Sequence, residues 1–113
     1  MRIAKITTTF SKRGEADEVL RRLIEERLVA CAHLERVSSS YNWMGVERSD
    51  DEWRVTLKAP LEKQADAVSR LEELHSYEVP MILWTEEETT DAYAEWVEKQ
   101  TSAEDPDNPY EDA

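Results

Sequence analysis

The sequence contains little cysteine, little glycine and no long hydrophobic run. A single cysteine, Cys31, excludes a disulfide within the chain and is typical of a reducing compartment, so we expect a cytoplasmic protein. With only two glycines, a glycine-rich nucleotide-binding loop is not expected. No apolar stretch approaches the roughly 20 residues of a membrane helix, and the N-terminus lacks the apolar core of a secretion signal. We therefore expect neither a membrane partner nor a leader peptide.

Positive charge is also scarce. The 113 residues include 26 Asp and Glu against 14 Lys and Arg, which gives a net charge of −12. The negative electrostatic field of such a chain repels phosphate backbones and argues against a nucleic-acid partner. An acidic, lysine-poor surface suits a cytoplasm of high salt, because salt screens self-repulsion. Residues 101–113 carry five acidic residues and no basic one, so we predict one domain over residues 1–100 followed by a disordered acidic tail.

Hydrophobic periodicity predicts seven elements in the order β-α-β-β-α-β-α. Apolar or Thr residues alternate in the first segment, as in a strand with one buried face, and a helical spacing begins at Ala16. The final helix is expected to begin at Thr89 or Thr90, both of which are suitable N-caps. The other expected elements are strands at residues 2–10, 30–46, 53–59 and 79–84 and helices at residues 16–28 and 61–74.

Three local features refine this pattern. The polar residues Glu47–Asp51 indicate a turn between the two central strands, and the serines at 38–40 indicate a bend or bulge in the first of them. The continuous apolar run Val79–Trp84 favours a central strand. The acidic run at residues 86–88 is typical of a solvated loop.

The element order predicts an α+β fold. Two β-α-β units around a central hairpin form the ferredoxin-like split β-α-β sandwich, with an antiparallel sheet, helices on one face and, here, an extra C-terminal helix. The long hairpin carries Tyr41, Trp43 and Trp53, which a monomer of this size cannot cover. An exposed aromatic patch of that size indicates an oligomer.

Several short motifs in this order resemble those of the CutA family, the divalent-cation tolerance proteins, over residues 3–100. The motifs are Glu26–Cys31, Tyr41-x-Trp43-x-Gly45, Lys58, His75–Pro80 and Tyr93-x-x-Trp96. The resemblance implies a ferredoxin-like subunit whose long hairpins wrap neighbours into a homotrimer. It also implies a role in metal-ion tolerance or response, with copper or another divalent ion bound, no obligatory cofactor and no enzymatic reaction.

The chain departs from the family pattern at three places. Ser76 stands where the family usually has Pro, and Met81 stands where it usually has Glu, which removes a carboxylate from a candidate site. Glu35 and Arg36 occupy the region where the family usually bends the second strand with Pro-Gly. This last departure bears on the geometry of the bend more than on the fold.

Cys31 and His33 are the first candidate metal ligands. They are two residues apart on a strand, so their side chains point to one face. A thiolate and an imidazole suit copper or zinc, but two ligands fall short of a tetrahedral set. The structural alternative, a small buried hydrophobic residue without a metal, is the more common situation for a lone cysteine.

His75 is the other candidate ligand, at a junction between a helix and a strand. There its imidazole could bind a metal or satisfy the carbonyls at the end of the helix. We expect a pocket at a subunit boundary formed by His75 together with Tyr41, Trp43 and Tyr77. The aromatic rings could equally serve packing alone.

Two other functions remain open at this point. A trimeric signalling or scaffold module resembling the PII-type proteins would act through protein partners. A small acylphosphatase-type hydrolase would use Arg13, in the loop before the first helix, to hold an anion near backbone N–H groups.

Overall fold

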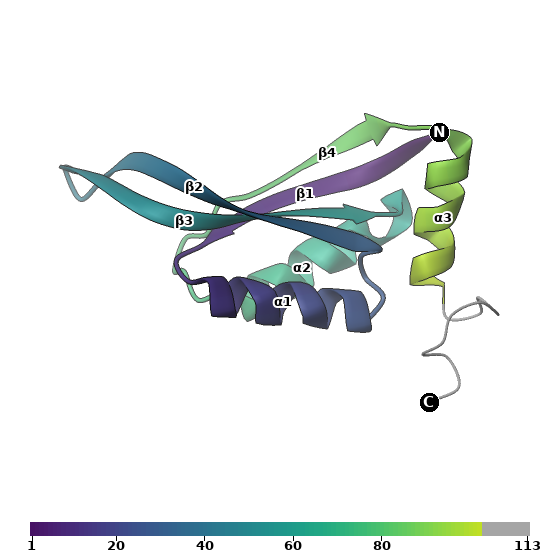
Figure 1. The fold of residues 1–113 in the computed structure, drawn as a ribbon, viewed down its shortest axis with the longest axis horizontal. Helices are drawn as coiled ribbons and strands as arrows, with labels where there is room; N and C mark the ends of the chain where they lie inside the picture. Colours follow the sequence, from purple (N-terminus) through teal and green to yellow (C-terminus); the bar gives the residue numbers. More distant parts are fainter. Residues whose placement is uncertain (103–113) are drawn as a thin grey trace.

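The elements follow one another in the predicted order. A computed structural model describes residues 1–102 and places four strands and three α-helices (Figure 1). The acidic segment predicted to be disordered lies, from residue 103 onward, outside the described residues. None of the helices in the described part is long and apolar enough to cross a membrane. The elements are β1 (Arg2–Phe10), α1 (Arg13–Glu25), β2 (Cys31–Trp43), β3 (Val46–Ala59), a 3-10 turn (Leu61–Lys63), α2 (Gln64–Leu74), β4 (Ile82–Glu88) and α3 (Asp91–Thr101).

The four strands form one antiparallel sheet in the order β2-β3-β1-β4. Helices α1 and α2 cover one face of it (Figure 1). The predicted alternation in β1 is confirmed, because Ala4, Ile6, Thr8 and Phe10 are all buried. The three apolar members of this set belong to one core with residues of α1, α2 and β3, so the helix-covered face is the hydrophobic centre of the domain.

Helix α3 lies at one end of the sheet (Figure 1), where it packs on the face opposite to α1 and α2. Ile3 is adjacent to Ala4 in β1 and therefore points to the other side of the sheet. It packs with Ala94 and Val97 of α3 in a second, smaller core. The predicted N-cap is confirmed, because the Thr90 hydroxyl accepts a hydrogen bond from the backbone N–H of Tyr93. We call the rest of this face the open face, because no helix of residues 1–102 lies over it.

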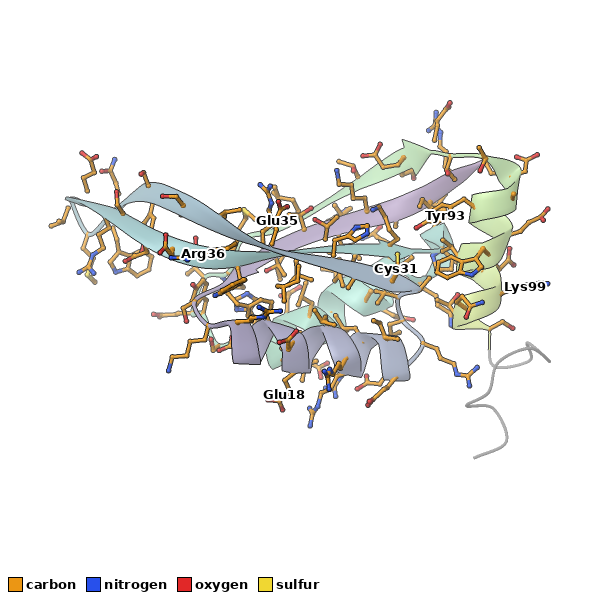
Figure 2. All side chains as sticks on the ribbon, viewed as in Figure 1. Glu18, Cys31, Glu35, Arg36, Tyr93 and Lys99 are labelled. Carbon is orange, nitrogen blue, oxygen red and sulfur yellow. The ribbon has the colours of Figure 1, made fainter. Side chains whose placement is uncertain are left out.

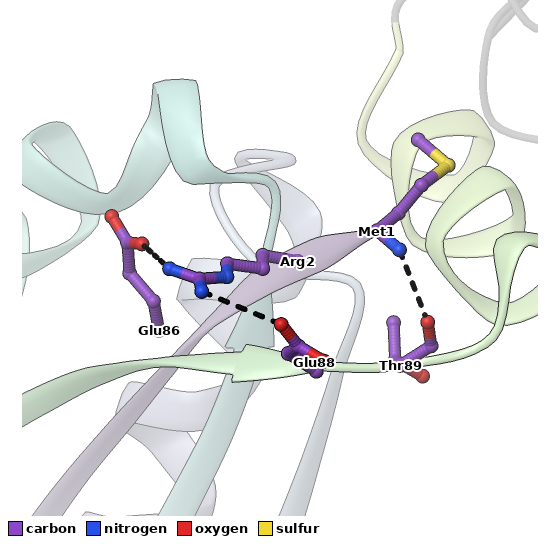
Figure 3. Close-up of polar contacts among 5 residues, drawn as sticks. All are labelled: Met1, Arg2, Glu86, Glu88 and Thr89. Carbon is purple, nitrogen blue, oxygen red and sulfur yellow. Dashed lines mark hydrogen bonds and ion pairs between the residues drawn. The ribbon is translucent and has the colours of Figure 1, made fainter.

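The acidic run at residues 86–88 belongs to β4, so its predicted placement in a loop is wrong. Arg2 of β1 donates hydrogen bonds to Glu86 (3.3 Å) and Glu88 (3.4 Å), and the N-terminal amine reaches the Thr89 carbonyl (Figure 3). Backbone pairing with β1, together with a cation between two carboxylates, keeps this charged segment extended.

The turn of the central hairpin lies at Met44 and Gly45, which corrects the prediction of a turn at Glu47–Asp51. Both turn residues have positive φ, 52° and 78°, as a tight hairpin turn requires. The pairing of β2 with β3 continues without interruption from Cys31 opposite Lys58 to Trp43 opposite Val46. The predicted bulge at the serines of β2 is therefore also wrong, because every residue there has one partner.

Strand β4 also differs from its prediction. It begins at Ile82 rather than Val79, and it is an edge strand that pairs only with β1. Its Leu83 and Trp84 are 57% and 52% exposed, so the apolar run finds little cover within this chain. Helix α1 likewise ends at Glu25, three residues before the predicted Leu28, because Arg27 takes a positive φ of 59°.

Half of the central hairpin projects beyond the sheet. Strand β3 pairs with β1 only over residues 53–59, so its first half is paired with β2 alone. We call residues 37–52 the distal ribbon (Figure 1). It gives the chain a radius of gyration of 15.3 Å, against about 13 Å for a compact domain of about 100 residues. An isolated two-stranded ribbon is marginally stable in water, so this half needs external support.

Candidate functional site

A groove of about 730 Å³ lies where the distal ribbon leaves the sheet. The structure brings Tyr41 and Trp43 of β2 into it together with Tyr77 of the loop between α2 and β4. These are the three aromatic residues that the sequence assigned to one pocket. The lining also includes Val37, Arg48, Glu52, Val79 and Met81. The lining thus combines apolar and charged side chains.

The two tyrosines of the groove are hydrogen-bond donors to carboxylates. The Tyr77 hydroxyl donates to Glu52 Oε2 at 2.7 Å, and burial together with this carboxylate raises the pKa of Tyr77 well above its usual range. The Tyr41 hydroxyl donates to Asp50, and this hydrogen bond raises the pKa of Tyr41. Both phenols therefore stay protonated at neutral pH, each bound to a carboxylate.

His75 lies behind this groove, on the helix-covered side of the sheet. Its ring stacks on Phe10, with centroids 4.3 Å apart. Its Nδ1 accepts a hydrogen bond from the Tyr77 backbone N–H (3.1 Å), so in the neutral ring the proton is on Nε2, which donates to the Thr9 carbonyl (2.9 Å). Burial lowers the pKa of His75. A metal at this imidazole would have to displace one of the two hydrogen bonds.

Cys31 and His33 lie on the open face, as their spacing predicts. Their cross-strand partners on β3 are Lys58 and Thr56. The half-buried Cys31 Sγ lies 3.3 Å from the Tyr93 hydroxyl, whereas His33 is exposed. Within residues 1–102 no group of three or more His, Cys, Asp or Glu side chains is placed to hold a metal ion. The pair is therefore an incomplete ligand set in one chain, and His75 lies across the sheet from it.

Tyr93 is the contact of Cys31 that sequence reasoning missed. Figure 2 shows the two side chains beside each other at the end of the sheet where α3 packs. Burial, together with the neighbouring thiol, raises the pKa of Tyr93 to about 12. The Tyr93-x-x-Trp96 motif was the available signal, since the two rings stack with centroids 5.7 Å apart. The sequence, however, places this pair only on an apolar helix face.

Arg13, the residue of the hydrolase alternative, is engaged on the surface of α1. It forms an ion pair with Asp17 at 3.7 Å, and its guanidinium lies 5.3 Å from the centre of the Trp53 ring. These contacts give the side chain a structural role in holding the start of α1 against β3.

Comparison with known proteins identifies the family. The model of the family described as "CutA1 divalent ion tolerance protein" matches residues 4–100, which is most of the chain. The chain belongs to the CutA family. A CutA divalent-cation tolerance protein of Thermotoga maritima is 33% identical over 93 residues, covering 81% of this chain and 92% of its own. One of Pyrococcus horikoshii is 32% identical over 97 residues, covering 85% and 95%.

Solved CutA structures share the fold. The crystal structure of Pyrococcus horikoshii CutA1 has a TM-score of 0.84 at 30% identity and covers 88% of this chain and 98% of its own. A CutA structure from Archaeoglobus fulgidus, described as a periplasmic divalent cation tolerance protein, has a TM-score of 0.83 at 25% identity and covers 90% and 100%. The CutA family is named for divalent-cation tolerance and not for a reaction, and the match favours this role over the PII-type alternative.

Proposed function

We propose that this chain is a homotrimeric, non-enzymatic protein of divalent-cation tolerance that binds copper or another divalent ion weakly. In this proposal each subunit is a ferredoxin-like split β-α-β sandwich. The observation that supports it most is the distal ribbon, which carries a groove lined by aromatic side chains and, within residues 1–102, leaves Tyr41, Trp43 and Val46 exposed. Membership of the CutA family supplies the link to divalent cations.

The sheet edges support association. Strand β2 at one edge and β4 at the other each have only one neighbour in the described chain. Unprotected edges favour pairing with another chain. The exposed Leu83 and Trp84 of β4 and the exposed Tyr41 and Trp43 of β2 add apolar surface beside both edges. A closed ring of identical subunits would cover both edges at once.

For the metal we propose Cys31 and His33 as the principal donor pair, with further ligands from another subunit. A thiolate and an imidazole are suitable for copper or zinc, and both side chains lie on the open face. The Lys58 ammonium stands opposite Cys31, and its charge opposes a bound cation, which is why we propose weak binding. His75 is a separate candidate that must first release the Thr9 carbonyl or the Tyr77 amide.

A copper titration followed by tryptophan fluorescence tests the metal assignment. We expect saturable quenching in the wild type and at least about tenfold weaker binding in Cys31→Ser and in His33→Ala, since each removes one of two donors. His75→Gln is expected to bind as the wild type does. Loss of binding in His75→Gln alone would move the site to the groove, and no saturable binding in the wild type would end the metal proposal.

We also propose a cytoplasmic location, supported by the single cysteine. Fractionation of the source cells, followed by immunodetection, tests it. Recovery of the protein with a periplasmic marker, as the description of the Archaeoglobus fulgidus protein would suggest, contradicts this location.

A further inference from the structure

Six side chains form a regular array on the open face of the sheet. The register places Lys5 of β1 opposite Lys58 of β3, and Lys58 opposite Cys31 of β2. The next row on the same face is Thr7, Thr56 and His33. We call these six residues the donor array: Lys5, Lys58, Cys31, Thr7, Thr56 and His33. Each can donate a hydrogen bond, and none is a carboxylate.

The two lysines of the donor array face each other without compensation. Directly opposite residues have Cβ atoms about 4.5–5.5 Å apart, and like charges there destabilise a sheet. Both side chains are half-buried, and within residues 1–102 neither has a hydrogen bond or ion pair with another side chain. On this face Glu35 is paired with Arg54, and Glu87, two residues from the Thr85 that faces Lys5, accepts from Thr85 and forms no ion pair with either lysine.

This arrangement contrasts with that of Lys63, the third half-buried lysine among residues 1–102, which donates hydrogen bonds to the carbonyls of Arg27 and Thr101. With 26 acidic residues available, Arg2, Arg36, Arg54 and Arg70 each meet at least one carboxylate. A pair of half-buried ammonium groups without an ion pair in residues 1–102, on a face that α1 and α2 leave open, therefore points to a negative charge supplied from outside the described residues.

We propose that the donor array binds a small molecule through a phosphate group. Two ammonium groups on adjacent strands match an oxyanion carrying about two negative charges, and charge-assisted hydrogen bonds are the strong kind. The Thr7 and Thr56 hydroxyls and the His33 imidazole lie one row further along, where they can donate to the remaining oxygens or to the rest of the ligand. At the other end the Tyr93 hydroxyl lies beside Cys31, and the Tyr93 ring stacks with that of Trp96.

This site goes beyond the proposed metal function and is tested independently of it. The titrations are done with a chelator present, so that a failure of the copper proposal leaves the anion result unaffected. Inorganic phosphate and glycerol phosphate are compared at the same ionic strength, which distinguishes free phosphate from a phosphate ester as the ligand.

Isothermal calorimetry on the wild type and on lysine variants gives the direct test. We expect saturable binding of one or both probes, weakened at least about tenfold in Lys58→Met and in Lys5→Met, since each removes one charged donor. Lys12→Met is the matched control, because Lys12 is an exposed lysine outside the array, and it should bind as the wild type does. An equal loss in all three variants would show a generic charge effect and overturn the site.

A second readout keeps the test valid if a variant is altered in stability. Phosphate should raise the midpoint of thermal unfolding of the wild type and of Lys12→Met and leave that of Lys58→Met unchanged, because a ligand stabilises only the form that binds it. In the separate copper titration Lys58→Met should bind copper more tightly, the opposite of its effect on phosphate. A wild type that binds neither probe, as when a carboxylate of another subunit already occupies the lysines, would overturn the proposal.

Discussion

The two halves of the central hairpin share strands and register but differ in burial. In the half that belongs to the sheet, Val55, Leu57 and Ala59 are fully or almost fully buried against the helices. In the distal ribbon, Trp43 is 45% exposed and Val46 is 57% exposed, although the backbone pairing continues. The comparison shows that pairing extends as far as the strands do, whereas burial depends on what lies over them. Within residues 1–102 the distal half is covered only in part, by the loop between α2 and β4.

The largest expected effect is on the free energy of unfolding, when a buried side chain in the half that belongs to the sheet is truncated. Leu57→Ala removes a fully buried side chain and should lower the free energy of unfolding by about 2–5 kcal/mol. Val46→Ala in the distal ribbon should lower it by less than about 1 kcal/mol. Urea denaturation at one chain concentration measures both, and equal losses would contradict the difference between the halves.

Truncation of an aromatic residue in the distal ribbon should act on association instead. Trp43→Ser is expected to weaken subunit association by about 2 kcal/mol or more, roughly 30-fold, because large aromatic residues carry much of an interface's energy. Sedimentation velocity over a concentration series measures this, and far-UV circular dichroism should report an unchanged fold. Met44→Ser, at the 90% exposed turn of the same ribbon, is the matched control. Unfolding of Trp43→Ser without dissociation would assign this indole to the subunit's own core.

His75, which packs against Phe10 on the helix-covered side of the sheet, should make stability depend on pH. Burial lowers the pKa of His75 below its ordinary value of about 6.5, so the unfolded chain binds more protons than the folded chain in that range. Stability should therefore be fully present above about pH 6.5 and decrease as the pH falls from there toward the lower folded pKa. Thermal unfolding of the wild type and of His75→Gln measures the difference, and an unchanged slope in His75→Gln would contradict this assignment.

The smallest expected effect concerns the part of the open face that α3 covers. Thr90→Ala removes the N-cap of α3 and should lower the free energy of unfolding by about 1 kcal/mol. Because Tyr93 of this helix contacts Cys31, the same variant should speed the reaction of the thiol with an aromatic disulfide reagent. Thr89→Ala, one residue outside the helix, provides the comparison, and identical thiol reactivity in the two variants would contradict the coupling.

Elements with one clear period could be predicted from the sequence. Buried residues alternate along β1, and along β3 from Trp53, as the sequence predicts. The N-cap of α3 is Thr90, one of the two predicted residues. The turn is not found where the residues indicate, because Glu47–Asp51 is polar enough for a loop but is held in β3 by pairing with β2. The polar residue types of this segment predicted a solvent-exposed loop. Its pairing with β2, which the sequence does not reveal, makes it a strand.

The site was predictable where it depended on spacing and not where it depended on contacts across the fold. Cys31 and His33 share a face because they are two residues apart, and the groove gathers Tyr41, Trp43 and Tyr77. The position of β4 at an edge, the hydrogen bonds of His75 and the pairing of Lys5 with Lys58 depend on register between distant segments. Local periodicity carries no information about that register.

The number of chains in the native particle tests the central proposal most directly. Native mass spectrometry of the full chain, recorded with and without copper, reports subunit number and bound ions together. The proposal that neighbouring subunits cover the distal ribbon predicts three chains in both conditions, with additional mass from copper in one. A single-chain particle at the same concentration, with the fluorescence of its tryptophans shielded from solvent quenchers, would contradict it.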